Sequence, residues 1–384
     1  MDMAKPIIRF KGYQDDWEQR KLGDVVDSVD TGKSRFDKEG SSGEYPILGS
    51  TSVIGYDDEY DYEGDFILTA RVGANAGSLY RHAGKVKISD NTVFIQASQN
   101  IEFLYQLLIQ FDIKKLSFGT GQPLVKASEL KSLELMMPTD MKEQMRIGVY
   151  FKNLDTLITL HQRKCDETKK LKKYMLQKMF PQNGEKVPEI RFSGFTDDWE
   201  QRKLSEIALQ TYGGGTPKTA NEEFWKGNIP WIQSSDLIEE RLFNVKPRKY
   251  ISQEAISKSA TKLVPQNSVA IVTRVGVGKL AFMPFSYATS QDFLSLSELK
   301  IEPEFAVYAL YKMMRLVSNE VQGTSIKGIT KDELLAKEIL IPDCEEQKKI
   351  GAYLHNLDHL ITLHQRELEN LQNIKKFMLG KMFV

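Results

Sequence analysis

Cysteine is scarce in this 384-residue sequence: Cys165 and Cys344 are the only two. A disulfide framework is therefore excluded, and two free thiols indicate a reducing compartment, so we expect a cytoplasmic protein. No apolar run reaches the roughly 18–20 residues of a membrane span, and the first residues lack the apolar stretch of a signal peptide. We expect no membrane partner.

An excess of charge of either sign is also missing. Lysine plus arginine and aspartate plus glutamate both number 52, so the formal net charge is zero. A domain that binds nucleic acid with its whole surface usually has a clear basic excess, and that class is not indicated here. A neutral total still allows one basic face opposite acidic ones, so composition leaves DNA binding open.

Motifs of nucleotide chemistry are absent. No two prolines are adjacent, so the Asn/Asp-Pro-Pro-Tyr/Phe motif of DNA methyltransferases cannot occur. Residues 274–279 (RVGVGK) resemble part of a phosphate loop, but Thr273 stands where the first glycine belongs. Leu280 follows the lysine, where a hydroxyl should coordinate magnesium. We therefore predict no catalytic site.

A metal site is not expected either. His355 and His359 are one helical turn apart, as metal ligands can be. The positions that match them in the repeat described next are Lys152 and Thr156, so a duplicated metal site is excluded.

The chain contains the same unit twice. Residues 6–22 (PIIRFKGYQDDWEQRKL) recur as residues 188–204 (PEIRFSGFTDDWEQRKL). A second matched pair begins at Glu143 (EQMRIGVYFKNLDTLITLHQRK) and at Glu346 (EQKKIGAYLHNLDHLITLHQRE). A period of roughly 190 residues indicates a duplicated domain and helix rather than a solenoid. Most of the extra length of the second copy lies between Ser234 and Arg274. The two copies therefore match at their ends and differ in their central segments.

Both copies end in a long amphipathic helix. Apolar residues recur in steps of four and three over more than four heptads, and Leu157, Leu160, Leu360 and Leu363 are expected to widen the apolar stripe. About 40 residues at 1.5 Å per residue give a helix of roughly 60 Å. The expected seam consists of Ile147, Phe151, Leu154 and Ile158 in the first copy and Ile350, Leu354, Leu357 and Ile361 in the second.

The two helices are each other's obvious partners. Copies related by a pseudo-two-fold axis would pack them antiparallel, and the alternative is two unrelated helices that each cover their own domain. His161 and His364 lie in the seam, where we expect them to be packed or hydrogen-bonded.

The segments between the matched ends of each copy have the sequence pattern of mixed α/β or α+β domains. Runs such as DFILTARV, KVKISDNTVFIQ, NSVAIVTRV and DFLSLSELKI carry the β-branched and aromatic bias of strands. Glycine-rich turns break them, and helical stretches are expected near residues 101–116 and 303–320.

Several loops contain matched residues with DNA-contacting chemistry. Hydroxyl, lysine and arginine side chains can bind phosphates, asparagine and glutamine can bond adenine, and arginine can bond guanine. The matched loops are TGKSR with GGGTPKT, SDN with SQD, GTGQPLVK with GTSIKGIT, and the shared RVG. Singly, each of these features is more often an ordinary turn or ion pair; their recurrence at matched positions makes a DNA contact and a purely structural role equally good interpretations. The candidates are Lys33, Ser34, Arg35, Ser50, Arg71, Asn75, Asn91, Gly119, Gly121, Gln122 and Lys126 in the first copy, and Thr216, Lys218, Ser234, Ser235, Arg274, Lys279, Gln291, Asp292, Thr324, Ser325 and Lys327 in the second.

These motifs and their duplication resemble the specificity subunits of type I restriction-modification systems over essentially the whole chain. The resemblance rests on FTDDWEQRKL, IPWIQSSDL, TRVG and the repeated EQxxI…LDxLITLHQR helices. It implies α/β (α+β) target-recognition domains in two copies, joined by two long antiparallel, coiled-coil-like helices. The implied boundaries are residues 1–140 and 188–342 for the recognition domains, 141–180 and 343–384 for the helices, and 181–187 for a linker.

The resemblance also implies partners and a division of labour. Each recognition domain would read one half of a bipartite, asymmetric site in double-stranded DNA, and the helices would set the spacing and dock two modification subunits. Restriction subunits would join them, and S-adenosylmethionine, ATP and magnesium would belong to these partners, leaving this chain non-catalytic. The alternatives are a coiled-coil scaffold that binds no DNA and a free-standing DNA-binding repressor.

Overall fold

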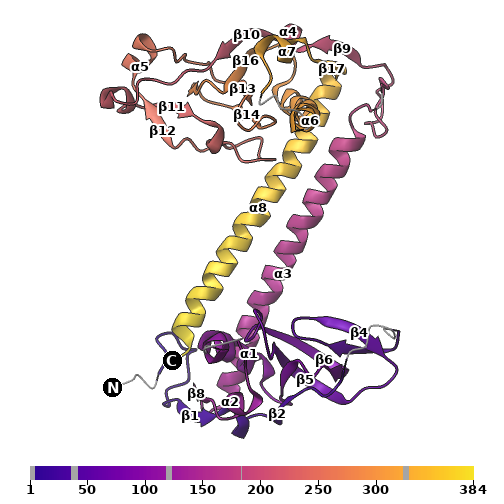
Figure 1. The fold of residues 1–384 in the computed structure, drawn as a ribbon, viewed down its shortest axis with the longest axis vertical. Helices are drawn as coiled ribbons and strands as arrows, with labels where there is room; N and C mark the ends of the chain where they lie inside the picture. The colour runs from indigo at the N-terminus through magenta and orange to yellow at the C-terminus, as the bar shows by residue number, and fades with distance from the viewer. Residues whose placement is uncertain (1–4, 36–41, 118–122, 183, 323–327) are drawn as a thin grey trace. The chain divides into compact units, whose positions relative to one another are not determined.

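The protein divides into two compact units, each of which contains parts of both long helices. The computed structural model describes residues 5–35, 42–117, 123–182, 184–322 and 328–384. Unit 1 comprises Met1–Arg163 and His364–Val384, and unit 2 comprises Lys164–Leu363. Figure 1 shows one domain of strands and short helices in each unit, with the helices α3 (Met141–Lys178) and α8 (Cys344–Met382).

Unit 1 is built around a mixed sheet with the strand order β2-β7-β5-β6-β3-β4. The order of elements is β1 (Glu18–Lys21), η1 (Leu22–Asp24), β2 (Ser28–Thr31), β3 (Tyr45–Leu48), β4 (Val53–Asp57), β5 (Tyr62–Ala70), β6 (Leu79–Ile88), β7 (Thr92–Gln96), α1 (Ile101–Phe111), η2 (Ile113–Ser117), α2 (Ala127–Lys131), β8 (Glu134–Met137) and the first part of α3. The strands and the helix expected from the sequence are all present in this domain.

Unit 2 divides its strands between two main sheets, β10-β16-β13-β14 and β12-β11-β15. Its elements are β9 (Glu200–Lys203), α4 (Leu204–Ile207), β10 (Ala208–Gly213), η3 (Glu222–Trp225), β11 (Ile229–Ile232), η4 (Ser234–Asp236), β12 (Lys249–Ile251), α5 (Gln253–Lys258), β13 (Ser268–Val272), β14 (Leu280–Met283), β15 (Ala288–Thr289), β16 (Phe293–Leu299), α6 (Pro303–Gln322), α7 (Lys331–Ala336) and β17 (Glu338–Ile341). The extra length of the second copy forms β12 and α5.

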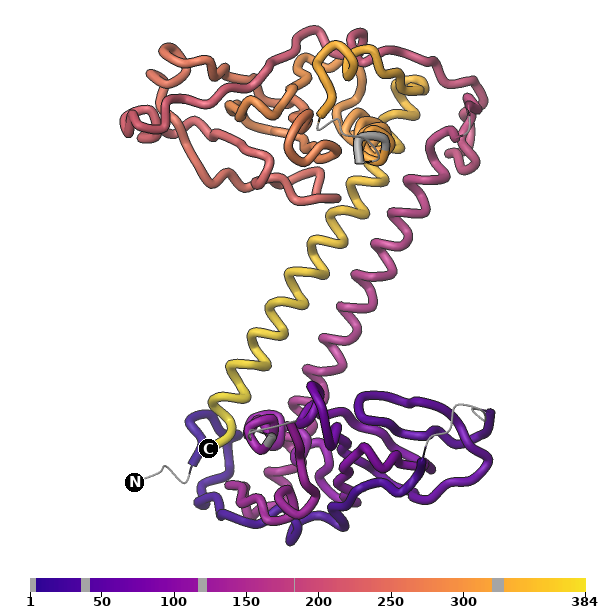
Figure 2. Tube along the Cα trace, viewed as in Figure 1, coloured from indigo at the N-terminus to yellow at the C-terminus, as the bar shows by residue number. Residues whose placement is uncertain are grey.

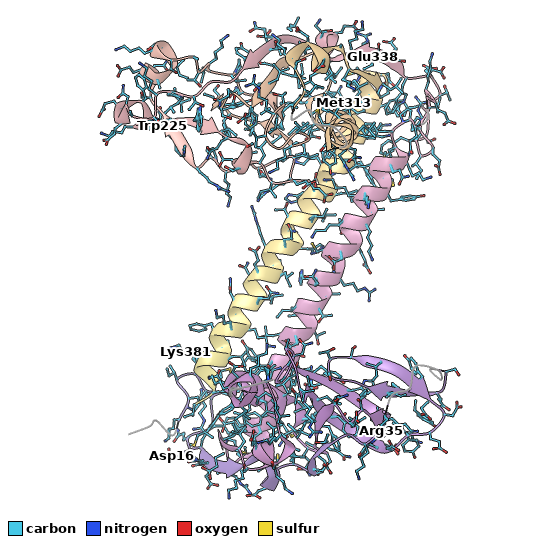
Figure 3. All side chains as sticks on the ribbon, viewed as in Figure 1. Asp16, Arg35, Trp225, Met313, Glu338 and Lys381 are labelled. Carbon is cyan, nitrogen blue, oxygen red and sulfur yellow. The ribbon has the colours of Figure 1, made fainter. Side chains whose placement is uncertain are left out.

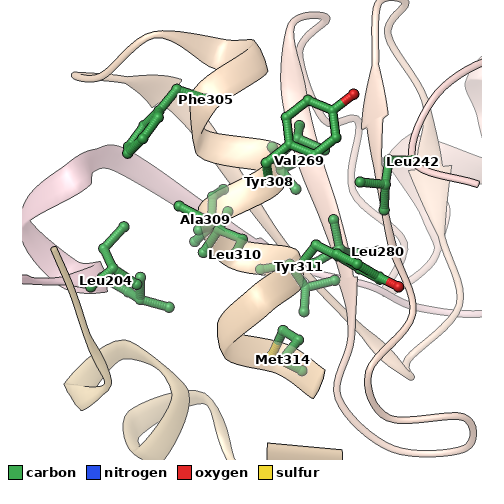
Figure 4. Packing of buried hydrophobic residues seen from close by; sticks show 14 of the residues in the cluster. Leu204, Leu242, Val269, Leu280, Phe305, Tyr308, Ala309, Leu310, Tyr311 and Met314 are labelled. Carbon is green, nitrogen blue, oxygen red and sulfur yellow. The ribbon is translucent and has the colours of Figure 1, made fainter. Parts of the chain in front are cut away.

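Helix α6 is the centre of the unit 2 core. Every residue from Phe305 to Tyr311 is buried, and a helix that is buried on all sides must be enclosed by other elements. Figure 4 shows its side chains between Leu204 and the strand residues Val269 and Leu280. The sequence pattern expected a helix here, and its nearly unbroken apolar run explains the complete burial.

The ends of the long helices complete the two cores. In unit 1, Phe383 stacks on Phe103 of α1 at 5.8 Å between ring centroids and meets Trp17 edge-on at 6.1 Å. In unit 2, Phe180 stacks on Phe305 of α6 at 5.6 Å and meets Trp199 edge-on at 5.8 Å. The tube in Figure 2 accordingly ends beside the indigo start of the chain, within unit 1.

Within each unit the two helices pack antiparallel. In unit 1 an ion pair of 2.6 Å joins Lys375 Nζ to Asp155 Oδ1, and in unit 2 one of 2.5 Å joins Lys172 Nζ to Asp358 Oδ1. These are the same two repeat positions with the helices exchanged, so an equivalent ion pair joins the two helices within each unit. The predicted fold class is confirmed, and the finer domain boundaries stay a prediction.

The histidines of the seam also meet. Nδ1 of His161 lies 3.3 Å from Nδ1 of His364, and the two residues hold equivalent positions in the two copies. The expectation that these two histidines are packed or hydrogen-bonded in the seam is confirmed.

The buried part of the seam is shorter than the sequence pattern suggested. Ile147, Phe151 and Leu154 are buried with α1 and the end of α8, and Ile350, Leu354 and Leu357 are buried in the matching cluster of unit 2. Ile158 and Ile361 are half-buried. The expectation that Leu157, Leu160, Leu360 and Leu363 widen the stripe is wrong, because these side chains are 41–43% exposed.

A buried ion pair fixes the N-terminal segment of each copy to the start of its helix. Arg9 donates from Nε and Nη2 to the two carboxylate oxygens of Glu143, at 2.7 and 2.8 Å. Arg191 holds Glu346 in the same way, with both distances 2.8 Å. The Glu346 side chain is fully buried and that of Arg191 is 11% exposed. Bidentate pairing of this kind is the strong form of a charged hydrogen bond.

Glycine allows each helix to approach its domain closely. A Cβ atom at Gly148 of α3 would lie 2.7 Å from the backbone nitrogen of Phe103, and one at Gly351 of α8 would lie 2.8 Å from that of Phe305. A larger residue could not occupy either position without a backbone shift. Among the described helices none is long and apolar enough to cross a membrane.

Candidate nucleic-acid interface

In unit 1 the candidate loops are gathered by backbone hydrogen bonds. The Ser34 N–H donates to Ile88 O at 3.0 Å, and the Arg71 N–H donates to Asn91 O at 2.9 Å. The Ser50 hydroxyl donates to the same Asn91 carbonyl at 3.2 Å. Four predicted residues from four loops are thus brought together through the turn at residues 89–91.

The side chains of these loops remain available to a ligand. Lys33, Arg35, Arg71, Asn75 and Asn91 are all exposed. Arg35 is labelled in Figure 3 among the loops of unit 1. Lys126 is exposed as well, but its Nζ lies 3.0 Å from Glu129 Oε1, so this lysine forms a surface ion pair.

A pocket of about 690 Å³ lies next to the TGKSR loop. Its lining combines three predicted residues with a group that the sequence reading missed: Lys33, Ser34, Arg35, Ile47, Asp57, Tyr60, Asp61, Tyr62 and Lys87. The Ser34 hydroxyl donates to Asp61 Oδ2 at 2.7 Å. A hydrogen bond from Lys87 lowers the pKa of the Asp57 carboxyl, so this carboxylate stays ionised.

The chemistry of this pocket suits a ligand with both acidic and polar groups. Its cations can bind phosphate, and its carboxylates can accept from base amino groups. Tyrosine faces can stack on bases. The missed aspartates and tyrosines lie in the run YDDEYDYEGD at 56–65, which looks like a solvated acidic loop when charge alone is considered.

Unit 2 presents its candidates along one edge of the sheet β10-β16-β13-β14. Strand pairing places the end of β10, the end of β13 and the start of β16 at this edge, since Gly213 pairs with Leu294 and Val272 with Phe293. The loops at 214–218, 273–279 and 290–292 follow or precede these strand ends. Antiparallel pairing therefore brings together residues that are up to 78 positions apart, from 214 to 292.

Hydrogen bonds hold these loops to one another. The Thr216 hydroxyl donates to Gln291 Oε1 at 2.7 Å, and the Thr273 N–H donates to Asp292 O at 2.7 Å. The Ser290 N–H donates to Ile232 O at 2.9 Å, which brings the Ser234 turn alongside. Arg274 and Gln291 are exposed, whereas Lys279 is half-buried.

Lys218 of the matched loop and Ser235 are each held to a neighbouring segment through their backbone carbonyls. The Lys218 carbonyl accepts from Trp225 Nε1 at 3.3 Å, and the Ser235 carbonyl accepts from Arg248 Nη2 at 3.2 Å. Both side chains are exposed. Trp225 is labelled in Figure 3 in this part of unit 2.

The glycines of the matched loops serve the fold. A Cβ at Gly32 would lie 2.3 Å from the carbonyl oxygens of Ile88 and Ser89, and one at Gly214 would lie 1.8 Å from that of Ser290. No side chain could fit at either position, because the neighbouring turn of the same domain packs directly against the glycine.

Six candidates cannot be placed. Gly119, Gly121, Gln122, Thr324, Ser325 and Lys327 lie outside the described residues. Across the described ranges no group of three or more His, Cys, Asp and Glu side chains is arranged to hold a metal ion.

Known proteins share this duplicated architecture. The family described as "Type I restriction modification DNA specificity domain" matches residues 14–170 and 196–373. The MjaVIII specificity subunit of Methanocaldococcus jannaschii is 25% identical over 394 residues, covering 94% of this chain and 91% of the relative. The EcoR124I/EcoR124II specificity subunit of Escherichia coli is 31% identical over 172 residues, covering 42% of this chain and 41% of the relative.

A solved structure supports the fold. The S subunit of a type I restriction-modification system from M. genitalium superposes with a TM-score of 0.72 at 15% identity, and 99% of each chain is covered. At 15% identity this structural similarity supports the fold and not a function. Because the family match extends over both copies and most of the sequence, this chain belongs to the type I restriction-modification DNA specificity family.

Proposed function

We propose that this chain selects the DNA target of a type I restriction-modification complex, with each unit reading one half of a bipartite, asymmetric site in double-stranded DNA. One observation carries the proposal. Hydrogen bonds hold matched loops together in both units, yet the side chains on those loops differ: Lys33 and Arg35 in one, Thr216 and Gln291 in the other. Two domains with a common framework but different loop side chains are suited to a bipartite DNA site whose halves differ in sequence.

Exchange of the first reader tests this proposal. Replacing residues 23–138 by the same segment of another specificity subunit should change one half of the methylated site and leave the other half and the spacing unchanged. Comparison of the methylated sites in cells that carry either gene measures both halves at once. A change in both halves contradicts the assignment of one domain to one half.

Two modification subunits are the partners we propose for the helices. Each unit exposes four apolar helix residues at equivalent repeat positions, 41–57% accessible: Leu157, Leu160, Ile374 and Phe377 in unit 1, and Leu171, Tyr174, Leu360 and Leu363 in unit 2. We call these sets the unit 1 patch and the unit 2 patch. With the seam at heptad positions a and d, they occupy c and g. In an antiparallel pair the g positions of both helices lie on the same side.

Exposed apolar clusters of this kind mark interaction sites, and their repetition supports two equivalent partners. We expect Leu157→Asp with Ile374→Asp to remove one modification subunit from the complex, and Leu171→Asp with Leu360→Asp to remove the other. The mass of the purified complex at saturating partner concentration measures the number bound. Thr159→Asp, an exposed substitution on α3, is the matched control and should retain both. Two subunits bound to either patch variant would contradict the proposal.

The chemistry of the complex we assign to the partners. S-adenosylmethionine and the methyl transfer would belong to the modification subunits, and ATP and magnesium to the restriction subunits. Specific binding by the assembled complex is the expected result. Specific binding by this chain without any partner would favour a free-standing repressor, and a complex that assembles without binding DNA would favour a scaffold.

A further inference from the structure

The loop between β13 and β14 exposes an apolar side chain at its tip. Val275 is 71% exposed, the highest fraction among the exposed large hydrophobic residues that the structure describes. Isolated apolar residues on a surface need no explanation in general. This one is notable because it follows Arg274 directly, at the sheet edge where the other candidate contacts of unit 2 are gathered.

The backbone that carries Val275 is fixed on both sides. The Thr273 N–H donates to Asp292 O at 2.7 Å, and the Ile329 N–H donates to Thr273 O at 2.8 Å. The Val277 N–H then donates to Arg274 O at 3.2 Å, and Gly276 adopts φ +92°, which closes the turn. An exposed valine has few rotamers, so little conformational entropy is lost when it is covered.

Unit 1 has an Arg-Val pair at the matching place, but its valine is less exposed and the backbone hydrogen bonds are made by the arginine itself. Val72 follows Arg71, Gly73 adopts φ +87°, and Val72 is 37% exposed. The Arg71 N–H donates to Asn91 O at 2.9 Å, and the Val125 N–H donates to Arg71 O at 2.8 Å. Both readers therefore hold an Arg-Val pair at the tip of a fixed loop, and the valine protrudes further in unit 2.

The neighbours of Val275 decide which ligand suits it. Arg274, Gln291 and Asp292 offer donors and acceptors of the kinds that bond base edges in the major groove. The apolar group that the major groove presents among those edges is the C5-methyl of thymine. We propose that Val275 contacts a thymine methyl group in the half-site read by unit 2 and so helps determine its sequence. This inference rests on the function proposed above.

Replacement of single thymines by deoxyuridine tests the contact, because it removes only the methyl group. The assembled complex of this chain with its modification subunits is titrated with duplexes of its methylated site, each carrying one such replacement. We expect one position in the unit 2 half-site at which deoxyuridine weakens binding about fourfold, the value of one buried methyl-sized group. Val275→Ala should weaken binding to the thymine duplex by a similar factor and remove the sensitivity to deoxyuridine at that position.

A control variant separates the contact from general effects. Leu209→Ala alters an exposed residue, 63% accessible, near the start of β10 and thus away from the edge where β13 ends; it should leave binding and deoxyuridine sensitivity unchanged. A specific complex with no sensitive thymine in that half-site, or with a sensitivity that Val275→Ala leaves intact, overturns this inference alone. Binding that does not depend on the site at all overturns the proposed function instead.

Discussion

Glu346→Gln should destabilise unit 2 by about 3–5 kcal/mol, the typical effect of breaking a buried ion pair by removing one partner. Glutamine has nearly the same shape, so no cavity forms. What is lost is the negative charge opposite Arg191, whose side chain is only 11% exposed. The hydrogen bond to Glu346 is also the main reason why the pKa of the Arg191 guanidinium is raised above its usual value. The arginine therefore stays charged and is left without compensation.

Urea unfolding followed by tryptophan fluorescence measures this effect, because Trp199, Trp225 and Trp231 lie in unit 2 and only Trp17 lies in unit 1. Glu200→Gln is the control. Its carboxylate pairs with Arg202 at 2.6 Å, but both side chains are at least 50% exposed, and a solvent-screened pair of this kind contributes little to stability. Equal stability of the two variants would show that the Arg191–Glu346 pair does not stabilise the attachment of α8 to its domain.

Leu154→Asp together with Leu357→Asp is expected to cost several kcal/mol in both units. These residues are 8% and 6% exposed and occupy equivalent places in the two cores. Each substitution removes a packed side chain and buries a carboxylate with no partner, and leucine deletion alone costs about 2–5 kcal/mol. Thermal unfolding should shift strongly to lower temperature.

The adjacent pair Leu157→Asp and Leu360→Asp provides the contrast. Both leucines are 42% exposed, so we expect thermal unfolding close to that of the original chain. Both pairs are leucine-to-aspartate substitutions, and the second pair lies three residues further along each helix. Comparison of the two pairs therefore distinguishes the buried seam from the surface that we propose for the modification subunits. If both pairs destabilise equally, the assignment of seam and surface is incorrect.

The sequence predicted the features that repetition and periodicity express. The duplication located both helices, and β-branched runs located strands such as β13 and β16. It could not predict the Arg9–Glu143 pair, whose members lie 134 positions apart in segments with no shared local pattern. Leu157 and Leu360 were misread because the sequence of an apolar residue beside a seam is the same whether its side chain is buried or exposed.

The candidate site followed the same division. The matched loops were visible as repeats, and unit 2 does gather Thr216 with Gln291. The aspartates and tyrosines of the unit 1 pocket were missed because they recur nowhere in the second copy. Residues that recur in both copies identify the shared framework of the two recognition domains. Residues that occur in one domain only cannot be found by comparing the copies.

The position of Phe383 has a consequence for how the chain is made. This residue packs on Trp17 and Phe103, and the Ile8 N–H donates to Lys381 O at 2.8 Å. Domains usually fold from the N-terminus as synthesis proceeds. Here the first domain to leave the ribosome lacks part of its core until residue 383 has been translated. In unit 2 the matching aromatic residue is Phe180, which is translated before its partner Trp199. Among the described residues, the contacts that close unit 1 therefore have the greatest sequence separation, and we expect them to form last.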